Sequence, residues 1–131
     1  LRLGREMGAD TEILTAAILL HDIGRKAERA SRGRLCHARL GARMAAGILA
    51  DLGLDRERID RICHCIRTHR FRSDHPPESL EAKILFDADK LDSIGAIGIG
   101  RAFLFAGQIG ACLHNPEQDH EETLSYSRED S

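Results

Sequence analysis

Two residues that could ligate a metal or move a proton stand at the end of an apolar run. Residues 13–26 read ILTAAILLHDIGRK, so the run leads directly into His21 and Asp22. Successive residues of a helix rotate by about 100°, which turns Asp22 about 40° to one side of Ile18 and His21 about 60° to the other. We therefore predict that an imidazole and a carboxylate both lie on the buried face of this helix.

Two further histidines lie on apolar stripes of later helical segments. His37 leads one stripe and His69 ends another, whereas His64 lies about 140° from His69, on the polar side of its helix. A single buried histidine is more often a hydrogen-bonded core residue than a ligand. Three of them beside a carboxylate indicate a metal site, because one cation satisfies several buried polar groups at once. The stripes are Leu40, Gly41, Met44, Ile48 and Leu52 after His37, and Ile59, Ile62 and Ile66 before His69.

Three aspartates follow in the segment KILFDADKLD. Helical spacing places Asp89 at one margin of the apolar stripe and Asp87 at the other. Periodicity therefore does not choose a ligand among Asp87, Asp89 and Asp92, and a solvated acidic face accounts for any one of them. The stripe itself consists of Leu80, Ile84, Ala88 and Leu91.

The basic residues are clustered, although the formal net charge is -2. Arg25 and Lys26 directly follow the His-Asp pair, and Arg67, Arg70 and Arg72 form a second cluster. A negative net charge argues against a general nucleic-acid binder. Arg25 could clamp a phosphate group, whereas a solvated surface position suits Lys26 better.

Helical spacing accounts for nearly every periodic segment, and no segment alternates like a β-strand, so we predict an all-α fold. Asp10, Asp55 and Ser79 are suited to cap helices, and Gly24 and Gly53 to end them. The closely spaced glycines of IGAIGIGRAFLFAGQIG match no phosphate-loop motif and indicate close helix packing. The expected helices run from Asp10 to about Asp22, from Cys36 to Leu52, from about Asp55 to about Arg70, and from Ser79 to about Asp92.

The chain has 131 residues, enough for one domain with its own core. No apolar run approaches the roughly 20 residues that span a bilayer, and no signal-peptide pattern opens the sequence. We therefore expect a soluble cytoplasmic protein whose four cysteines are free thiols. Cys63 and Cys65 flank His64 without the two-residue gap of a zinc knuckle.

Several phrases together make the chain resemble the HD superfamily of metal-dependent phosphohydrolases, in particular the YedJ-like HD proteins. They are LLHDIG, CHARLGA, CIRTHRF, LEAKILFDADKLDSIGAIGIGRAF and LSYSREDS, and they cover nearly the whole chain in order. The resemblance implies a single helical HD domain over residues 1–131.

The resemblance also implies a ligand set. His21 and Asp22 match the family's His-Asp doublet, His37 and His69 match two additional histidines, and Asp89 matches the final aspartate. In the two-metal form Asp22 would bridge the ions, with His21 and Asp89 on one and His37 and His69 on the other. Mixed nitrogen and oxygen ligands suit one or two ions of Fe, Mn, Ni, Co or Zn, with Mg as a further option.

The remaining candidates are expected around these ligands. Asp87 and Asp92 would support the ligands or the helix packing. Substrate contacts are expected from Arg25, Lys26, His64, Arg70 and Arg72, with His64 acting from the far side of its helix.

The chain departs from the family pattern at both ends. The family's first ligand, a histidine on the preceding helix, has no counterpart because the sequence begins at Leu1, within that helix. The family also continues in helices beyond Ser131. We expect that the native gene product begins earlier and supplies a histidine within two turns before Leu1, facing His21.

The resemblance predicts a phosphohydrolase, either a phosphomonoesterase or a phosphodiesterase, in which a metal-activated water attacks phosphorus. The expected substrate is a small phosphorylated molecule such as a nucleotide. Two alternatives stay open: a di-iron oxygenase resembling inositol oxygenase, and a non-catalytic domain that senses a metal or nucleotide. The sequence does not indicate an oligomeric state.

Overall fold

The computed structural model describes residues 1–70 and 76–111 of the chain. Every regular element in these ranges is a helix, which confirms the predicted all-α fold. The chain divides into two compact units, Leu1–Asp89 and Lys90–Ser131. The helices are α1 (Arg2–Glu6), α2 (Thr11–Leu20), α3 (Arg25–Ala30), α4 (His37–Asp51), α5 (Arg56–Thr68), α6 (Leu80–Leu91) and α7 (Gly95–Ile109).

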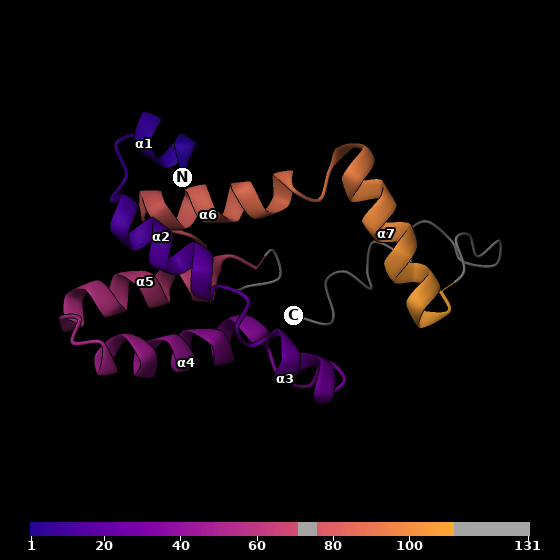
Figure 1. Ribbon diagram of the computed structural model, residues 1–131, viewed down its shortest axis with the longest axis horizontal. Helices are drawn as coiled ribbons and strands as arrows, with labels where there is room; N and C mark the ends of the chain where they lie inside the picture. The colour runs from indigo at the N-terminus through magenta and orange to yellow at the C-terminus, as the bar shows by residue number, and fades with distance from the viewer. Residues whose placement is uncertain (71–75, 112–131) are drawn as a thin grey trace. The chain divides into compact units, whose positions relative to one another are not determined.

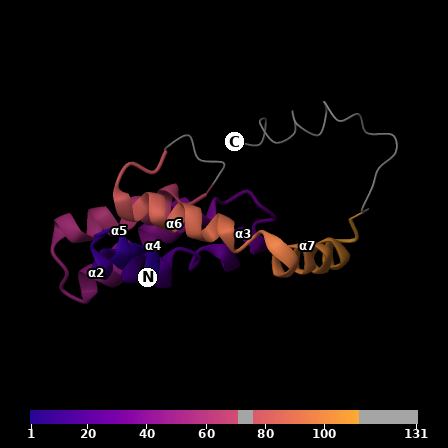
Figure 2. The ribbon, with the colours of Figure 1, turned by 90° about the horizontal axis from the view of Figure 1, so that it is seen from above.

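Helix α5 forms the centre of the first unit. It begins after Asp55, whose carboxylate accepts the Arg58 N–H at 2.9 Å, as the sequence predicts. Helix α4 packs along α5, and α2 packs against another side of it. Figures 1 and 2 show α4 and α5 together in both views. The predicted stripe of α5 is confirmed, since Ile59, Ile62 and Ile66 are at most 6% exposed.

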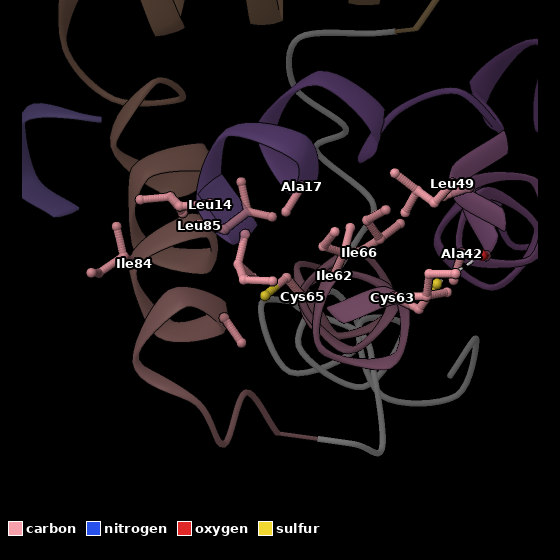
Figure 3. Close-up of a cluster of buried hydrophobic side chains, with 14 residues drawn as sticks. Leu14, Ala17, Ala42, Leu49, Ile62, Cys63, Cys65, Ile66, Ile84 and Leu85 are labelled. Atoms are coloured by element: carbon pink, nitrogen blue, oxygen red, sulfur yellow. Dashed lines mark hydrogen bonds between the residues drawn. The ribbon is translucent and has the colours of Figure 1, made fainter. Parts of the chain in front are cut away.

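The core joins side chains from four helices (Figure 3). Ile62 and Ile66 of α5 lie between the side chains of Leu14 and Leu85 on one side and Leu49 on the other. Burying each such aliphatic side chain contributes about 1.5–3 kcal/mol. This packing fixes the C-terminal end of α5, which carries His69.

The buried face of α4 includes His37 and Gly41, as predicted, but departs from the predicted stripe further along the helix. Met44 and Ile48 were expected in the core but are 42% and 44% exposed. Their neighbours Ala45 and Leu49 are buried instead, a rotation of about 100°. The helix presents mainly glycine and alanine to α5, and small side chains let two helix backbones approach closely. Hydropathy alone favours the larger side chains and so selects the wrong face.

Helix α6 begins where the sequence predicts, because the Ser79 hydroxyl accepts the Ala82 N–H at 3.1 Å. Its buried side chains include Ile84, as expected, but also Glu81. The Asp10 N–H donates to the Glu81 carboxylate at 2.9 Å. A buried acid is therefore retained here as the acceptor for the backbone at the start of α2.

Helix α7 lies in the second unit and follows a turn that contains Ser93. Gly98 approaches the backbone of Ser93 so closely that a Cβ atom would collide with it. Asp92 and Arg101 form an ion pair within this unit. In the described ranges no helix is both long and apolar enough to cross a bilayer. Cys36, Cys63 and Cys65 are free thiols, and Cys112 lies outside the described residues.

Candidate metal centre

The His-Asp pair lies on a turn and not on the helix predicted for it. Asp10 caps α2 by accepting the Ile13 N–H at 3.1 Å, but α2 ends at Leu20. His21 follows as the C-terminal cap, and Asp22 lies in the turn beyond it. Their side chains are 24% and 43% exposed, so the predicted position on a buried face is met only in part, and less by Asp22 than by His21.

Gly24 closes this turn by a close approach to α4. Its φ of -79° is not left-handed, so it does not end α2 in the manner predicted. A Cβ atom on Gly24 would collide with the His37 carbonyl oxygen and lie 3.1 Å from the Gly41 nitrogen. A Cβ on Gly41 would in turn lie 3.4 Å from the His21 carbonyl oxygen. The two glycines therefore let the backbone that carries Asp22 pack directly on the first turns of α4.

Three side chains from distant parts of the sequence converge at this junction. Asp22 Oδ1 lies 3.6 Å from His37 Nε2 and 3.7 Å from His69 Nε2. The two Nε2 atoms are 3.1 Å apart, and both histidines are only 1% exposed. These three ligand atoms lie within 4.8 Å of one another, a grouping that could hold a metal ion. His21 lies beside it, with Nε2 3.8 Å from Asp22 Oδ2.

The hydrogen bonds of the imidazoles favour a cation between them. The Nδ1–H of His21 donates to the Ile18 carbonyl at 2.8 Å, and that of His69 donates to the Ile66 carbonyl at 2.6 Å. A neutral imidazole carries one proton, so each of these rings presents an Nε2 lone pair toward Asp22. A cation placed between these lone pairs and the Asp22 carboxylate would satisfy all of them at once. The donor set therefore fits a divalent metal.

His69 is in the protonation state that a ligand requires. Its pKa is lowered to about 4, chiefly by burial and also by the neighbouring His21 and His37, against opposing contributions from the Ile66 carbonyl and Asp89. The imidazole is therefore neutral near pH 7, with its lone pair available for a metal.

Glu28 is a residue of this site that the sequence reasoning did not identify. It lies on α3, a helix that was not predicted, and its side chain is 14% exposed. Glu28 Oε2 is 2.9 Å from His37 Nδ1, although this close contact is poorly aligned with the ring N–H. The available signal was its position as a single acid among the arginines of residues 25–34.

Two of the predicted substrate-binding arginines contact carboxylates of the site. The Arg25 Nε donates to Asp22 Oδ1 at 2.9 Å, and its Nη1 lies 3.4 Å from Glu28 Oε2. The Arg70 Nη1 lies 3.4 Å from Glu28 Oε1 and 3.6 Å from the Cys36 sulfur. Both arginines thus bring positive charge to the cluster of Asp22, His37 and His69.

Three other predicted substrate-binding residues are not brought into the cluster. Lys26 is exposed on α3. His64 accepts the Glu78 N–H at 3.2 Å on a different side of α5 from His69. Arg72 lies outside the described residues.

The aspartates of α6 occupy different environments. The charge of Asp89 raises the pKa of His69, so its carboxylate acts on the histidine cluster, but Asp89 is not grouped with the three convergent ligands. Asp87 is exposed, and Asp92 pairs with Arg101 in the second unit. The assignment of Asp89 as a ligand, and of the other two as supporting residues, stays a prediction.

Comparison with known proteins assigns the chain to a family. A family model for the HD domain matches residues 1–94. The uncharacterized protein YpgQ of Bacillus subtilis is 37% identical over 121 residues, which cover 88% of this chain and 56% of that protein.

A solved structure shares the fold and much of the sequence. The crystal structure of a predicted HD superfamily hydrolase from an uncultured Thermotogales bacterium aligns with a TM-score of 0.67 and 38% identity. The alignment covers 79% of this chain and 56% of that structure. The chain thus spans about half the length of each relative.

Proposed function

The chain belongs to the HD-domain family, and we propose that it is a metal-dependent hydrolase of a phosphate ester or phosphodiester. The observation that carries this proposal is the convergence of Asp22, His37 and His69 on one point. The solved relative is described as a predicted hydrolase, which supports hydrolysis as the reaction class. We further propose a nucleotide or a similar small phosphorylated molecule as the substrate.

The residues divide into metal ligands and substrate contacts. Asp22, His37 and His69 would hold one divalent ion, and His21 and Asp89 would serve an adjacent one with Asp22 shared between them. A bound divalent metal would lower the pKa of a coordinated water to near neutrality and offset charge on the phosphoryl oxygens. Fe, Mn, Ni, Co and Zn suit this donor set, and Mg is a further candidate.

The buried His69 would help to keep the ion in place, because the hydrogen bond from its Nδ1–H to the Ile66 carbonyl holds the ring in a fixed orientation. Arg25 and Arg70 would bring cationic charge to an incoming phosphate. Arg25 already contacts two carboxylates, so it would both hold Asp22 and attract the substrate.

Metal analysis followed by an activity screen tests the proposal. The protein would be loaded in turn with Mn, Fe, Co, Ni, Zn or Mg and assayed on bis-p-nitrophenyl phosphate, p-nitrophenyl phosphate and nucleoside phosphates. We expect Asp22→Asn to lose most of the bound metal and nearly all turnover. Asp60→Asn, at an exposed position on α5, should retain both.

Three outcomes would contradict the proposal. Equal metal content in the wild type and in Asp22→Asn would show that Asp22 is not a metal ligand and would refute the proposed site. Stoichiometric metal binding without turnover of any phosphate ester would leave a metal-binding or sensing domain, and oxygen-dependent turnover of the iron form would indicate an oxygenase.

A further inference from the structure

We propose that Glu28 is a positioning residue that fixes His37 as a metal ligand. The inference rests on the proposed metal site, since it concerns how one of that site's histidines is held. Glu28 does not reach the convergent ligand atoms. It acts from behind the ring, where its Oε2 lies 2.9 Å from His37 Nδ1.

The position of His37 in its helix explains why an outside acceptor is needed. His21 and His69 follow the last residues of α2 and α5, and each donates its Nδ1–H to a carbonyl three residues earlier. Carbonyls at a helix C-terminus lack helical partners and are available for such bonds. His37 is instead the first residue of α4, where the unpaired backbone groups are N–H donors. The backbone of that turn supplies donors and not an acceptor for the His37 ring.

Glu28 meets this need because two arginines hold its carboxylate in place. The guanidinium of Arg25 lies 3.4 Å from its Oε2, and that of Arg70 lies 3.4 Å from its Oε1.

An ionised carboxylate at this distance favours the imidazole tautomer with the proton on Nδ1. The Nε2 lone pair of His37 then faces Asp22 and His69, as a ligand requires. Arg25 connects the same carboxylate to Asp22, so one guanidinium orients two parts of the site.

The test compares Glu28→Ala, Glu28→Gln and Glu57→Ala. Glu57 is an exposed acid in the first turn of α5, so its loss controls for the change in charge. Mn²⁺ affinity would be measured by calorimetry. The protonated nitrogen of His37 would be identified by long-range ¹H–¹⁵N NMR on metal-free protein at pH 8.

We expect Glu28→Ala to weaken Mn²⁺ binding about 10–100-fold, the usual effect of removing a partner of a ligating histidine. Glu28→Gln retains a neutral acceptor, so its loss should be smaller, and Glu57→Ala should bind as wild type does. The wild-type NMR spectrum should place the proton on Nδ1, and Glu28→Ala should shift protonation toward Nε2.

Two results would overturn the inference: wild-type Mn²⁺ affinity in both Glu28 variants, or an Nε2 proton on His37 in the neutral wild-type ring. If Glu28→Ala does not fold, the isosteric Glu28→Gln variant and the wild-type spectrum still decide the matter. Failure of the wild type to bind any metal would refute the proposed function instead, while the NMR measurement would still report on Glu28.

Discussion

At the scale of single residues, the two histidines near the end of α5 offer a direct comparison. His69 is 1% exposed and faces Asp22, whereas His64 accepts a backbone N–H from Glu78 on another side of the helix. We expect His69→Ala to lose most bound metal, because it removes a ligand from the cluster. His64→Ala should retain its metal, measured by elemental analysis after Mn²⁺ loading. If His64→Ala lost its metal while His69→Ala kept it, the assignment of His69 as a ligand would be wrong.

The burial of His69 also predicts a pH dependence of the metal-free protein. Its pKa is lowered to about 4 in the folded chain from 6.5. Between these values the unfolded state binds more protons, so the free energy of unfolding falls as the pH is lowered from about 6.5 toward 4. Above 6.5 this contribution is fully present.

Urea unfolding with EDTA at several pH values would measure that fall. His69→Gln should show a shallower decrease, since glutamine does not titrate while the other acids still do. If the free energy of unfolding fell equally with pH in the wild type and in His69→Gln, the protonation state assigned to His69 would be refuted.

At the scale of elements, the metal centre depends on the contact between the 21–24 turn and α4. Gly24→Ala would place a methyl group against the His37 carbonyl, and such overpacking costs about 1–3 kcal/mol. It should also weaken metal binding by moving Asp22 away from His37. Gly47→Ala is the matched control, because nothing lies within 4 Å of its Cβ position on the same α4. Urea unfolding and Mn²⁺ titration would compare the stability and the metal affinity of the two variants. Equal values for Gly24→Ala and Gly47→Ala would contradict the close contact between Gly24 and the His37 carbonyl.

The rotated face of α4 gives a second test with adjacent residues. Leu49 is 4% exposed and Ile48 is 44% exposed. Leu49→Ala should cost about 2–5 kcal/mol because it leaves a cavity in the core. Ile48→Ala removes a partly exposed side chain and should cost less than about 1 kcal/mol. A larger loss of stability for Ile48→Ala than for Leu49→Ala in urea unfolding would indicate that α4 buries the face expected from hydropathy.

At the scale of the whole molecule, metal binding should stabilise the fold. The candidate ligands come from the 21–24 turn, the start of α4 and the end of α5, so a bound ion cross-links elements that separate on unfolding. A ligand at 100 times its Kd adds about 2.7 kcal/mol to the free energy of unfolding. Mn²⁺ should therefore raise the Tm by several degrees, EDTA should reverse the rise, and Asp22→Asn should show none. A Tm of wild-type protein that does not respond to any divalent ion would contradict this linkage.

Local chemistry explains which features were predictable from the amino-acid sequence. Asp10, Asp55 and Ser79 mark helix starts because a capping side chain bonds to backbone groups only two or three residues away. The stripe that ends in His69 has strong 3.6-residue periodicity, so the buried face of α5 was also predictable. The phrases from LLHDIG to LSYSREDS, taken together over nearly the whole chain, indicated the HD superfamily.

Tertiary packing decided the rest, because it depends on partners that are distant in the sequence. How closely α5 approaches α4 determines whether Ala45 or Met44 is buried. The distance between the two helices cannot be predicted from the periodicity of α4 alone. His37 and His69 are 32 residues apart, yet their Nε2 atoms lie 3.1 Å from one another only after α4 and α5 have packed. Glu28 acquires its place behind His37 in the same way. Side-chain types and their local spacing therefore indicate which residues can bind a metal, and the folded chain alone determines which of them meet.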